Sequence, residues 1–393
     1  MTSNRSSYYQ IHTLSATLGN QPVQIVSKPG IPDWDRVSPA QSLIAAALKP
    51  APEARVLVLG CGHGGLGVTL ARQAYNGAVV LLDSSCIALD MTERTLRANG
   101  VTNAQVCMGI SVLPAQAGSF DLAVIAAPAD RKLTRRWLVE ARQALKDQGQ
   151  LFIAGANEHG IRSTIADAEA LFGATNVLAY KQGNRVAQAR KLPGSAPAAA
   201  WAGEAGIAPA TWYEFEVQAR GQIFRMRSLP GVFAHDRLDE GTALLLEALT
   251  FRADARVLDV GCGNGIIGLV ASRIGAAHVD MVDVNLLAVA AANENMAGNG
   301  ITNARAFLSD GVPEDAAQCY DLVVTNPPFH VGRSVDHDIA AAFIDRARRS
   351  LKPGGRLFLI GNQFIRYDRM LGTAFEQVEC LVATRSYRVW SAA

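Results

Sequence analysis

The residues with the clearest chemical purpose are the tetrapeptide Asn326-Pro327-Pro328-Phe329, which follows an apolar run. The side-chain oxygen of Asn326 and the backbone carbonyl of Pro327 could accept the two N–H groups of a planar amine. The prolines fix φ and carry no N–H, so these carbonyls are held rigid. Phe329 offers a ring face for stacking. The set suits methylation of an exocyclic amine or carboxamide, which needs alignment more than a strong base; taken alone, it could also be a rigid turn.

A glycine-rich segment, 259–265 (Asp-Val-Gly-Cys-Gly-Asn-Gly), follows an earlier apolar run. Gly261 and Gly263 allow a sharp turn and let a ligand approach the backbone, since no Cβ intervenes. Asp283 ends the next expected strand, where a carboxylate can accept hydrogen bonds from both ribose hydroxyls. These features indicate an adenosine-containing cofactor, and they would serve NAD and S-adenosylmethionine alike.

Three details favour S-adenosylmethionine. Asp259 lies at the strand end before the glycines, where a carboxylate can hold the ammonium group of the cofactor. Asp310 follows the expected strand 304–308 and can accept a hydrogen bond from an adenine amino group. The strand at 322–325 runs directly into Asn326 and its neighbours, for which a dehydrogenase has no use.

These groups need a parallel sheet to position them. In the second half of the chain, short apolar runs at 256–260, 278–283 and 322–325 alternate with helical patterns at 266–274 and 285–299. Such alternation predicts βαβ units and a doubly wound α/β domain, with ligands at the carboxyl ends of its strands.

The chain also repeats itself. Four segments of the first half match four of the second in the same order: 56–64 with 257–265, 99–104 with 299–304, 120–124 with 320–324, and 145–152 with 351–358. We therefore expect a tandem duplication of one fold. The predicted domains are 1–195 and 216–393, joined by an Ala-, Pro- and Gly-rich linker at 196–215.

The two halves differ at the groups that matter for catalysis. The first half carries Ala126-Ala127-Pro128-Ala129 in place of the Asn326 tetrapeptide, and Val58 in place of Asp259. We expect it to be catalytically inactive. Its glycines and Asp83 persist, which leaves cofactor binding there open.

At these residues the chain resembles a known family. The segment 229–242, the glycine loop and the run Asn-Pro-Pro-Phe-His at 326–330 together resemble the bacterial ribosomal RNA guanine-N2 methyltransferases with tandem domains. The small-subunit (16S) type is the closer resemblance and the large-subunit (23S) type the second. The resemblance is strong from 222 onward and mostly architectural before it. It implies two tandem doubly wound Rossmann-like class I methyltransferase domains and methylation of guanine N2, most closely in 16S rRNA.

The family's roles carry over to matching positions of this sequence. The resemblance implies cofactor binding by eight residues: Asp239, Gly241, Thr242, Asp259, Gly261, Gly263, Asp283 and Asp310. Of these, Asp239, Gly241 and Thr242 would close over the methionine end. Asn326, Pro327, Pro328 and Phe329 would hold the guanine, and Asn326 would also border the cofactor.

Positive side chains suggest where RNA phosphates could bind. A basic cluster on an expected helix of the first half and one residue that follows the tetrapeptide are the candidates: Arg131, Lys132, Arg135, Arg136 and Arg333. Each alone could belong to a solvated surface. Together they are typical of an inactive domain whose remaining role is to bind RNA phosphates. His330, next to Phe329, could instead touch the target base.

Composition limits the remaining possibilities. The 393 residues are 49% hydrophobic and 18% charged with a net charge of +2, which suits a two-domain globular protein and neither demands nor excludes nucleic acid. No apolar run could span a bilayer, and six scattered cysteines without a CxxC pair are typical of reduced thiols. We expect a cytoplasmic monomer without a metal site or membrane contact, whose partner is ribosomal RNA or a ribosomal subunit.

Several alternatives stay open at this stage. The same motif could methylate a 23S guanine, a DNA adenine or a protein glutamine, because all three offer planar amino groups. A non-enzymatic RNA-binding assembly protein and an NAD dehydrogenase are the rivals from other classes. The sequence does not fix which nucleotide is modified, or whether free RNA or an assembled subunit is the substrate.

Overall fold

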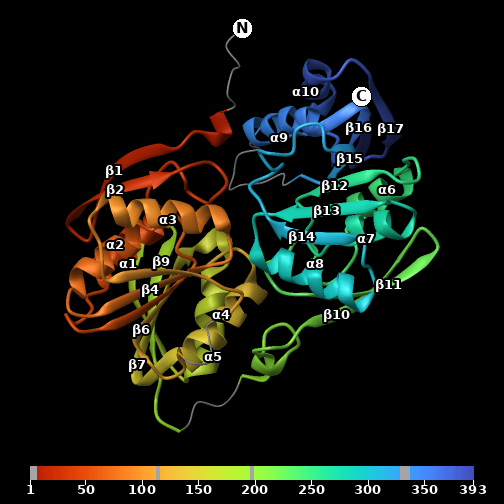
Figure 1. Cartoon of the computed structure of the whole chain (residues 1–393). Helices are drawn as coiled ribbons and strands as arrows, with labels where there is room; N and C mark the ends of the chain where they lie inside the picture. Colours follow the sequence, from red (N-terminus) through yellow and green to blue (C-terminus); the bar gives the residue numbers. More distant parts are fainter. Residues whose placement is uncertain (1–6, 112–115, 195–198, 328–336) are drawn as a thin grey trace. The chain divides into compact units, whose positions relative to one another are not determined.

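The computed structural model describes residues 7–111, 116–194, 199–327 and 337–393 (Figure 1). The chain divides into two compact units. The N-terminal unit comprises residues 11–212. The C-terminal unit comprises residues 213–393 together with residues 1–10.

The C-terminal unit is built on a seven-stranded sheet in the order β14-β13-β12-β15-β16-β18-β17. Its strands are β12 (Arg256–Val260), β13 (His278–Asp283), β14 (Ala304–Leu308), β15 (Tyr320–Thr325), β16 (Leu351–Asn362), β17 (Val378–Ala383) and β18 (Tyr387–Ala392). β14 through β16 are parallel, whereas β18 is antiparallel to both of its neighbours. The carboxyl ends of the parallel strands therefore meet at one edge.

Five helices and a hairpin accompany this sheet: α6 (Glu240–Ala248), α7 (Ile266–Arg273), α8 (Leu286–Gly298), α9 (His337–Ser350), α10 (Tyr367–Ala374) and the pair β10 (Tyr213–Ala219) and β11 (Gln222–Ser228). α6, α7 and α8 cover one face, and α9 and α10 cover the other (Figure 1). A short 3-10 helix, η1 (Ser7–Tyr9), belongs to this unit although it begins the described chain.

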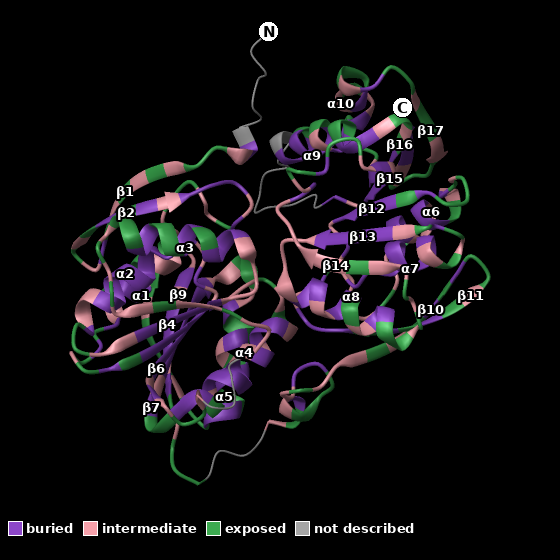
Figure 2. Ribbon diagram, in the orientation of Figure 1, coloured by how far each residue is buried: buried purple, intermediate pink, exposed green. Residues whose placement is uncertain are grey.

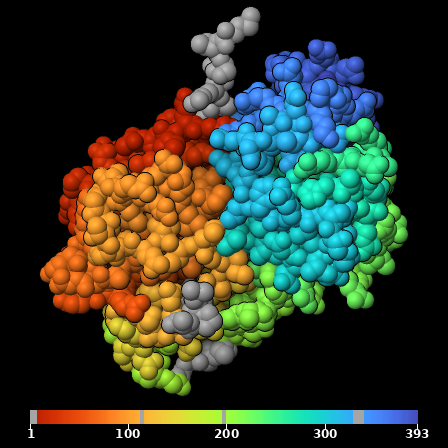
Figure 3. Space-filling model, viewed as in Figure 1, coloured from red at the N-terminus to blue at the C-terminus, as the bar shows by residue number. Residues whose placement is uncertain are grey.

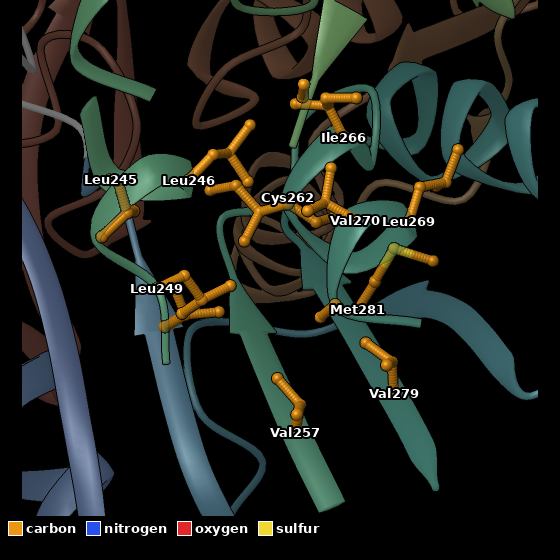
Figure 4. Close-up of a cluster of buried hydrophobic side chains, with 14 of the residues drawn as sticks. Leu245, Leu246, Leu249, Val257, Cys262, Ile266, Leu269, Val270, Val279 and Met281 are labelled. Carbon is orange, nitrogen blue, oxygen red and sulfur yellow. The ribbon is translucent and has the colours of Figure 1, made fainter. Parts of the chain in front are cut away.

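Alternating strand residues explain why both faces are covered. Val257 packs with α6 and α7 in the cluster of Figure 4, and its neighbour Leu258 packs in the cluster beneath α9. Both side chains are fully buried. Each such burial contributes roughly 1.5–3 kcal/mol, so each face of the sheet needs its layer of helices. Figure 2 shows central strands such as β13 mostly buried between those layers, whereas β14 at the edge of the sheet is less buried.

The N-terminal unit repeats this plan in the order β5-β4-β3-β6-β7-β9-β8. Its strands are β3 (Arg55–Leu59), β4 (Ala78–Asp83), β5 (Ala104–Met108), β6 (Phe120–Ala126), β7 (Leu145–Ala156), β8 (Thr175–Lys181) and β9 (Asn184–Arg190). Its other elements are α1 (Pro39–Ala47), α2 (Gly65–Gln73), α3 (Cys86–Ala98), α4 (Arg131–Ala144), α5 (Ile161–Phe172) and the hairpin β1 (His12–Leu18) and β2 (Gln21–Ser27). The identical strand order confirms the predicted pair of tandem Rossmann-like α/β domains.

The boundaries between the units differ from the predicted ones in two places. Residues 1–10 belong to the C-terminal unit, because Tyr8 is buried in its core cluster. Part of the predicted linker 196–215 is packed: Trp201 and Ile207 are buried in the N-terminal unit. The division falls after Trp212.

Side chains fill the spaces that the ribbons leave open, and the visible face of the C-terminal unit is formed mostly by the cyan and blue part of the chain (Figure 3). Among the described residues, no helix is long and apolar enough to cross a membrane.

Candidate active site

The glycine loop follows β12 and begins α7. Gly261, Gly263 and Gly265 have φ of +73°, +55° and +85°, a region that favours glycine. The amide of Gly263 donates to Oδ2 of Asp283 (3.0 Å), and the amide of Asn285 donates to Oδ1 (2.9 Å). Among the described residues, a Cβ on Gly263 would meet no atom within 4 Å, so they leave space beside the loop where a ligand could approach its backbone.

Asp259 is fully buried at the end of β12. Its Oδ2 accepts a hydrogen bond from the amide of Gly268 (3.0 Å), while Oδ1 has no hydrogen-bond partner within the described parts of the chain. Burial, reinforced by the charge of Asp283, raises the pKa of the Asp259 carboxyl to about 7. A buried acceptor without a partner is costly, and a donor or a positive charge from a ligand would relieve that cost.

Asn326 forms a hydrogen-bonded group with two residues of α6. Its Nδ2 donates to Oγ1 of Thr242 (2.9 Å) and lies 3.4 Å from Oδ2 of Asp239. Asp239 caps α6 by accepting from the amide of Thr242 (2.8 Å). Because a carboxylate only accepts, the amide turns its nitrogen toward Asp239 and its oxygen away from it. The orientation of Asn326 is thereby fixed by residues 84 and 87 positions away.

Tyr387, at the start of β18, borders this group. A Cβ on Gly241 would lie 3.1 Å from its ring, so glycine lets the tyrosine pack closely there. Burial and the nearby charges of Asp239 and Glu240 raise the pKa of the Tyr387 hydroxyl.

Asp310 lies on the same edge of the sheet. Asp283 pairs with Leu308 across β13 and β14, and the amide of Ser309 donates to the backbone carbonyl of Asp283 (3.0 Å). Asp310 follows two residues after Leu308, and it accepts a hydrogen bond from the hydroxyl of Tyr8. The structure thus brings seven of the predicted residues to one region of the strand ends, namely Asp239, Gly241, Thr242, Asp259, Gly263, Asp283 and Asn326, with Gly261 and Asp310 beside them.

Part of the predicted site is not described. Pro327 is buried, but Pro328, Phe329, His330 and Arg333 lie outside the described residues. Within the described ranges, no group of three or more His, Cys, Asp or Glu side chains could hold a metal ion.

The glycine loop of the N-terminal unit has the same hydrogen-bond pattern as that of the C-terminal unit, but different side chains surround it. The amides of Gly62 and Ser85 donate to the two oxygens of Asp83 (3.3 and 2.9 Å), as their counterparts do around Asp283. A Cβ on Gly60 would lie 3.0 Å from the indole of Trp137. The register of β5 against β4 places Ile110 where the C-terminal unit has Asp310.

The basic cluster on α4 is largely engaged within its own unit. Arg131 and Arg135 form ion pairs with Asp167 (2.7 and 3.0 Å), although half of the Arg131 side chain stays exposed. Arg136 is buried, pairs with Glu140 (3.0 Å) and donates to two backbone carbonyls. The assignment of Arg136 as an RNA contact was therefore wrong, because the buried face of α4 carries it inward.

The sequence interpretation missed Tyr8 and Trp137. Tyr8 is 302 positions from its partner Asp310, and no local pattern connects them. Trp137 could have been suspected, because a large aromatic residue on the helix after β6 can reach back over the strand ends.

Comparison with known proteins identifies the family of the chain. The profile of the methyltransferase small domain family matches residues 22–188 and 223–391, one match in each unit. The chain is 35% identical over 275 residues to the ribosomal RNA small subunit methyltransferase C of Chromohalobacter salexigens, covering 69% of this chain and 77% of the relative. The protein of the same name from Marinomonas sp. is 31% identical over 284 residues, covering 69% and 76%.

A solved structure is similar over both units. It is the 16S rRNA N2 G1207 methyltransferase of T. thermophilus in complex with AdoMet and guanosine. The identity is 31%, the TM-score is 0.80, and the similarity covers 99% of each chain.

Proposed function

The chain belongs to the methyltransferase small domain family, within the ribosomal RNA small subunit methyltransferase C group, and on this premise we propose that it transfers a methyl group from S-adenosylmethionine to N2 of a guanine in 16S rRNA. The observation that carries the proposal is the fixed orientation of Asn326. Its amide nitrogen is held by Thr242 and Asp239, which leaves its oxygen as the acceptor for the target amine.

The residues of the C-terminal unit fit the cofactor. The unpartnered Oδ1 of Asp259 suits an ammonium group reached directly or through water. Asp283 is held by two backbone amides at the carboxyl end of β13, where its carboxylate can accept from ribose hydroxyls. Asp310 would accept from the adenine amino group. When bound, S-adenosylmethionine supplies a methyl group made electrophilic by the sulfonium.

Asn326 would align the guanine. Its Oδ1 and the carbonyl of Pro327 accept the two N2–H groups, which draws the nitrogen lone pair toward the methyl group. The N2–CH₃ bond forms as the S–CH₃ bond breaks, and the N2 proton then leaves to water. Methylation acidifies the nitrogen, so no strong base is required. Phe329 would stack on the guanine ring, and a guanine inside a helix would have to be flipped out of it.

The N-terminal unit would position the RNA. We assign this role to the residues of the α4 cluster that are not buried, Arg131, Lys132 and Arg135, together with His330 and Arg333 of the C-terminal unit. The enzyme is proposed to act as a monomer in the cytoplasm.

The proposal is tested by Asn326→Ala and Asn326→Asp. Both variants should lower kcat by about 100-fold or more, because one oriented hydrogen-bond partner contributes that much in related sites. Binding of S-adenosylmethionine should change little in Asn326→Ala. In Asn326→Asp a second carboxylate would face Asp239, so the side chain could neither donate to it nor keep its orientation.

The measurement is incorporation of labelled methyl into 16S rRNA, 23S rRNA and assembled small subunits, followed by nucleoside mass spectrometry. N2-methylguanosine formed in 16S rRNA by the wild type supports the proposal. Methylation confined to 23S rRNA, or unchanged methylation by Asn326→Ala, would contradict it. Full activity in Asn326→Asp would point to a general base in place of an aligning amide.

A further inference from the structure

The first described residues of the chain contact the cofactor edge of the C-terminal unit. Tyr8, in η1, is only 2% exposed, and its hydroxyl donates to Oδ1 of Asp310. Its ring meets that of Phe343 edge to face, with centroids 5.7 Å apart and planes at 90°. A tyrosine so placed has its ring held by packing and its hydroxyl directed at one carboxylate.

The loop after β14 is held from several sides. A Cβ on Gly311 would lie 2.7 Å from the Phe343 ring, so the loop lies directly against α9. Arg346 of α9 donates to the carbonyl of Val312 (3.3 Å) and pairs with Glu314 (2.7 Å). The guanidinium of Arg346 lies 3.3 Å from the ring centroid of Tyr9. η1 and α9 therefore clamp the loop that carries Asp310.

Asp310 itself stands one strand away from the ribose-binding position. Its neighbour Ser309 donates to the backbone of Asp283, so the two carboxylates belong to adjacent strand ends. A carboxylate has about four lone-pair sites, so an oxygen that accepts from Tyr8 does not exhaust the group. A second donor, such as an adenine amino group, can be accepted at the same time.

We propose that Tyr8 is a positioning residue of the cofactor site, which holds the carboxylate of Asp310 in the orientation that accepts the adenine amino group. This inference rests on the proposed function and deepens it, because it assigns part of the adenine specificity to the N-terminal segment. The N-terminal unit lacks such a carboxylate, since Ile110 stands at the corresponding position.

The test uses the full chain and two cofactor analogues. S-adenosylhomocysteine carries the adenine amino group, and S-inosylhomocysteine carries an oxygen in its place. Calorimetry gives both dissociation constants for the wild type and for Tyr8→Phe, which keeps the ring and removes the hydroxyl. Tyr8→Phe should bind S-adenosylhomocysteine about three- to tenfold more weakly than the wild type does, and it should bind S-inosylhomocysteine with the wild-type affinity. The ratio of the two dissociation constants, which measures the preference for adenine, should therefore fall by the same factor. The kcat at saturating cofactor should stay at the wild-type value.

A double-mutant cycle sharpens the result. Asp310→Asn should reduce the preference for adenine, and adding Tyr8→Phe to it should produce little further loss, because Tyr8 is proposed to act only through the carboxylate of Asp310. Independent, additive losses would contradict a positioning role.

Tyr320→Phe is the matched control. Tyr320 donates to Asp280 (2.7 Å) and belongs to the same core cluster, but it lies at the amino end of β15. This variant should lower stability without altering the preference between the two analogues. Equal weakening of both analogues in Tyr8→Phe, or an unchanged preference, would overturn the inference. A wild type that binds neither analogue would instead overturn the proposed function.

Discussion

Among single residues, Asp259 combines complete burial with a carboxyl pKa of about 7, raised from 3.8 mainly by that burial. A raised pKa means that the folded state binds the proton more tightly than the unfolded state does. The stabilising contribution of this group is therefore complete below pH 4 and is lost as the pH rises through about 7. The whole effect is at most about 4 kcal/mol.

We expect Asp259→Asn to unfold at a higher denaturant concentration than the wild type at pH 8, and the difference between the two should be smaller at pH 5. Binding of S-adenosylmethionine to the wild type should strengthen as the pH rises through 7, because an ionised Asp259 pairs better with an ammonium group.

Asp280→Asn is the control, because the pKa of Asp280 is shifted in the opposite direction to that of Asp259. Burial raises the pKa of Asp280, but hydrogen bonds from Arg305, Tyr320 and His278 outweigh it and hold the pKa low. This variant should be less stable than the wild type at pH 8.

Single residues also show which parts of the candidate site can be predicted from the sequence. Asp259, Asp283 and Asn326 could be predicted because each lies at the carboxyl end of an apolar run that reads as a strand, and these strand ends meet at one edge of a parallel sheet. The hydrogen bonds from Asn326 to Thr242 and Asp239 could not, because they depend on how α6 packs beside β15. Arg136 was misassigned because a basic residue on a helix can face inward when a buried partner such as Glu140 accepts it.

Among the elements, the glycine loop before α7 needs glycine for two reasons: its left-handed backbone conformation and the space that the proposed cofactor would occupy. Gly263 (φ +55°) and Gly300 (φ +64°) both adopt left-handed conformations, and a Cβ on either would meet no atom of the described residues within 4 Å. Gly300 lies in the turn after α8, whereas Gly263 faces the proposed cofactor. Alanine at either position should therefore cost a similar amount of stability, about 1 kcal/mol.

Only Gly263→Ala should weaken the binding of S-adenosylmethionine, by at least about tenfold, because the added methyl group would occupy space that the ligand needs. Chemical denaturation and calorimetry on the two variants measure both quantities. Equal cofactor affinity in Gly263→Ala and Gly300→Ala would argue against ligand contact at this loop.

The elements were mostly predictable, since strands at 256–260, 278–283 and 304–308 and the helix at 266–274 follow from short apolar runs alternating with helical spacing. The structure places these at the expected positions, with α7 ending at Arg273. The linker prediction failed in part because Ala- and Gly-rich composition gave no warning that Trp201 and Ile207 would be buried.

At the scale of the whole molecule, duplication has produced two glycine loops of similar geometry. Only one should bind the cofactor. In the N-terminal unit Val58 replaces Asp259, Ile110 replaces Asp310, and Trp137 lies against Gly60. Calorimetry should give one S-adenosylmethionine per chain.

The pair Asp83 and Asp283 provides matched variants, because two backbone amides hold each carboxylate in the same way. Asp283→Ala should abolish detectable binding, and Asp83→Ala should leave the dissociation constant unchanged. A stoichiometry of two, or weakened binding in Asp83→Ala, would show that the N-terminal loop has kept its ligand.

The assignment of residues 1–10 to the C-terminal unit has a consequence for biosynthesis. The ribosome synthesises Tyr8 302 residues before Asp310, and α9 follows later still. All of residues 11–212 have been translated by the time β10 begins, so the N-terminal unit can fold while the segment that precedes it still lacks its partner. The proposed adenine end of the cofactor site is thus completed only when Tyr8 meets a residue that is synthesised 302 positions later.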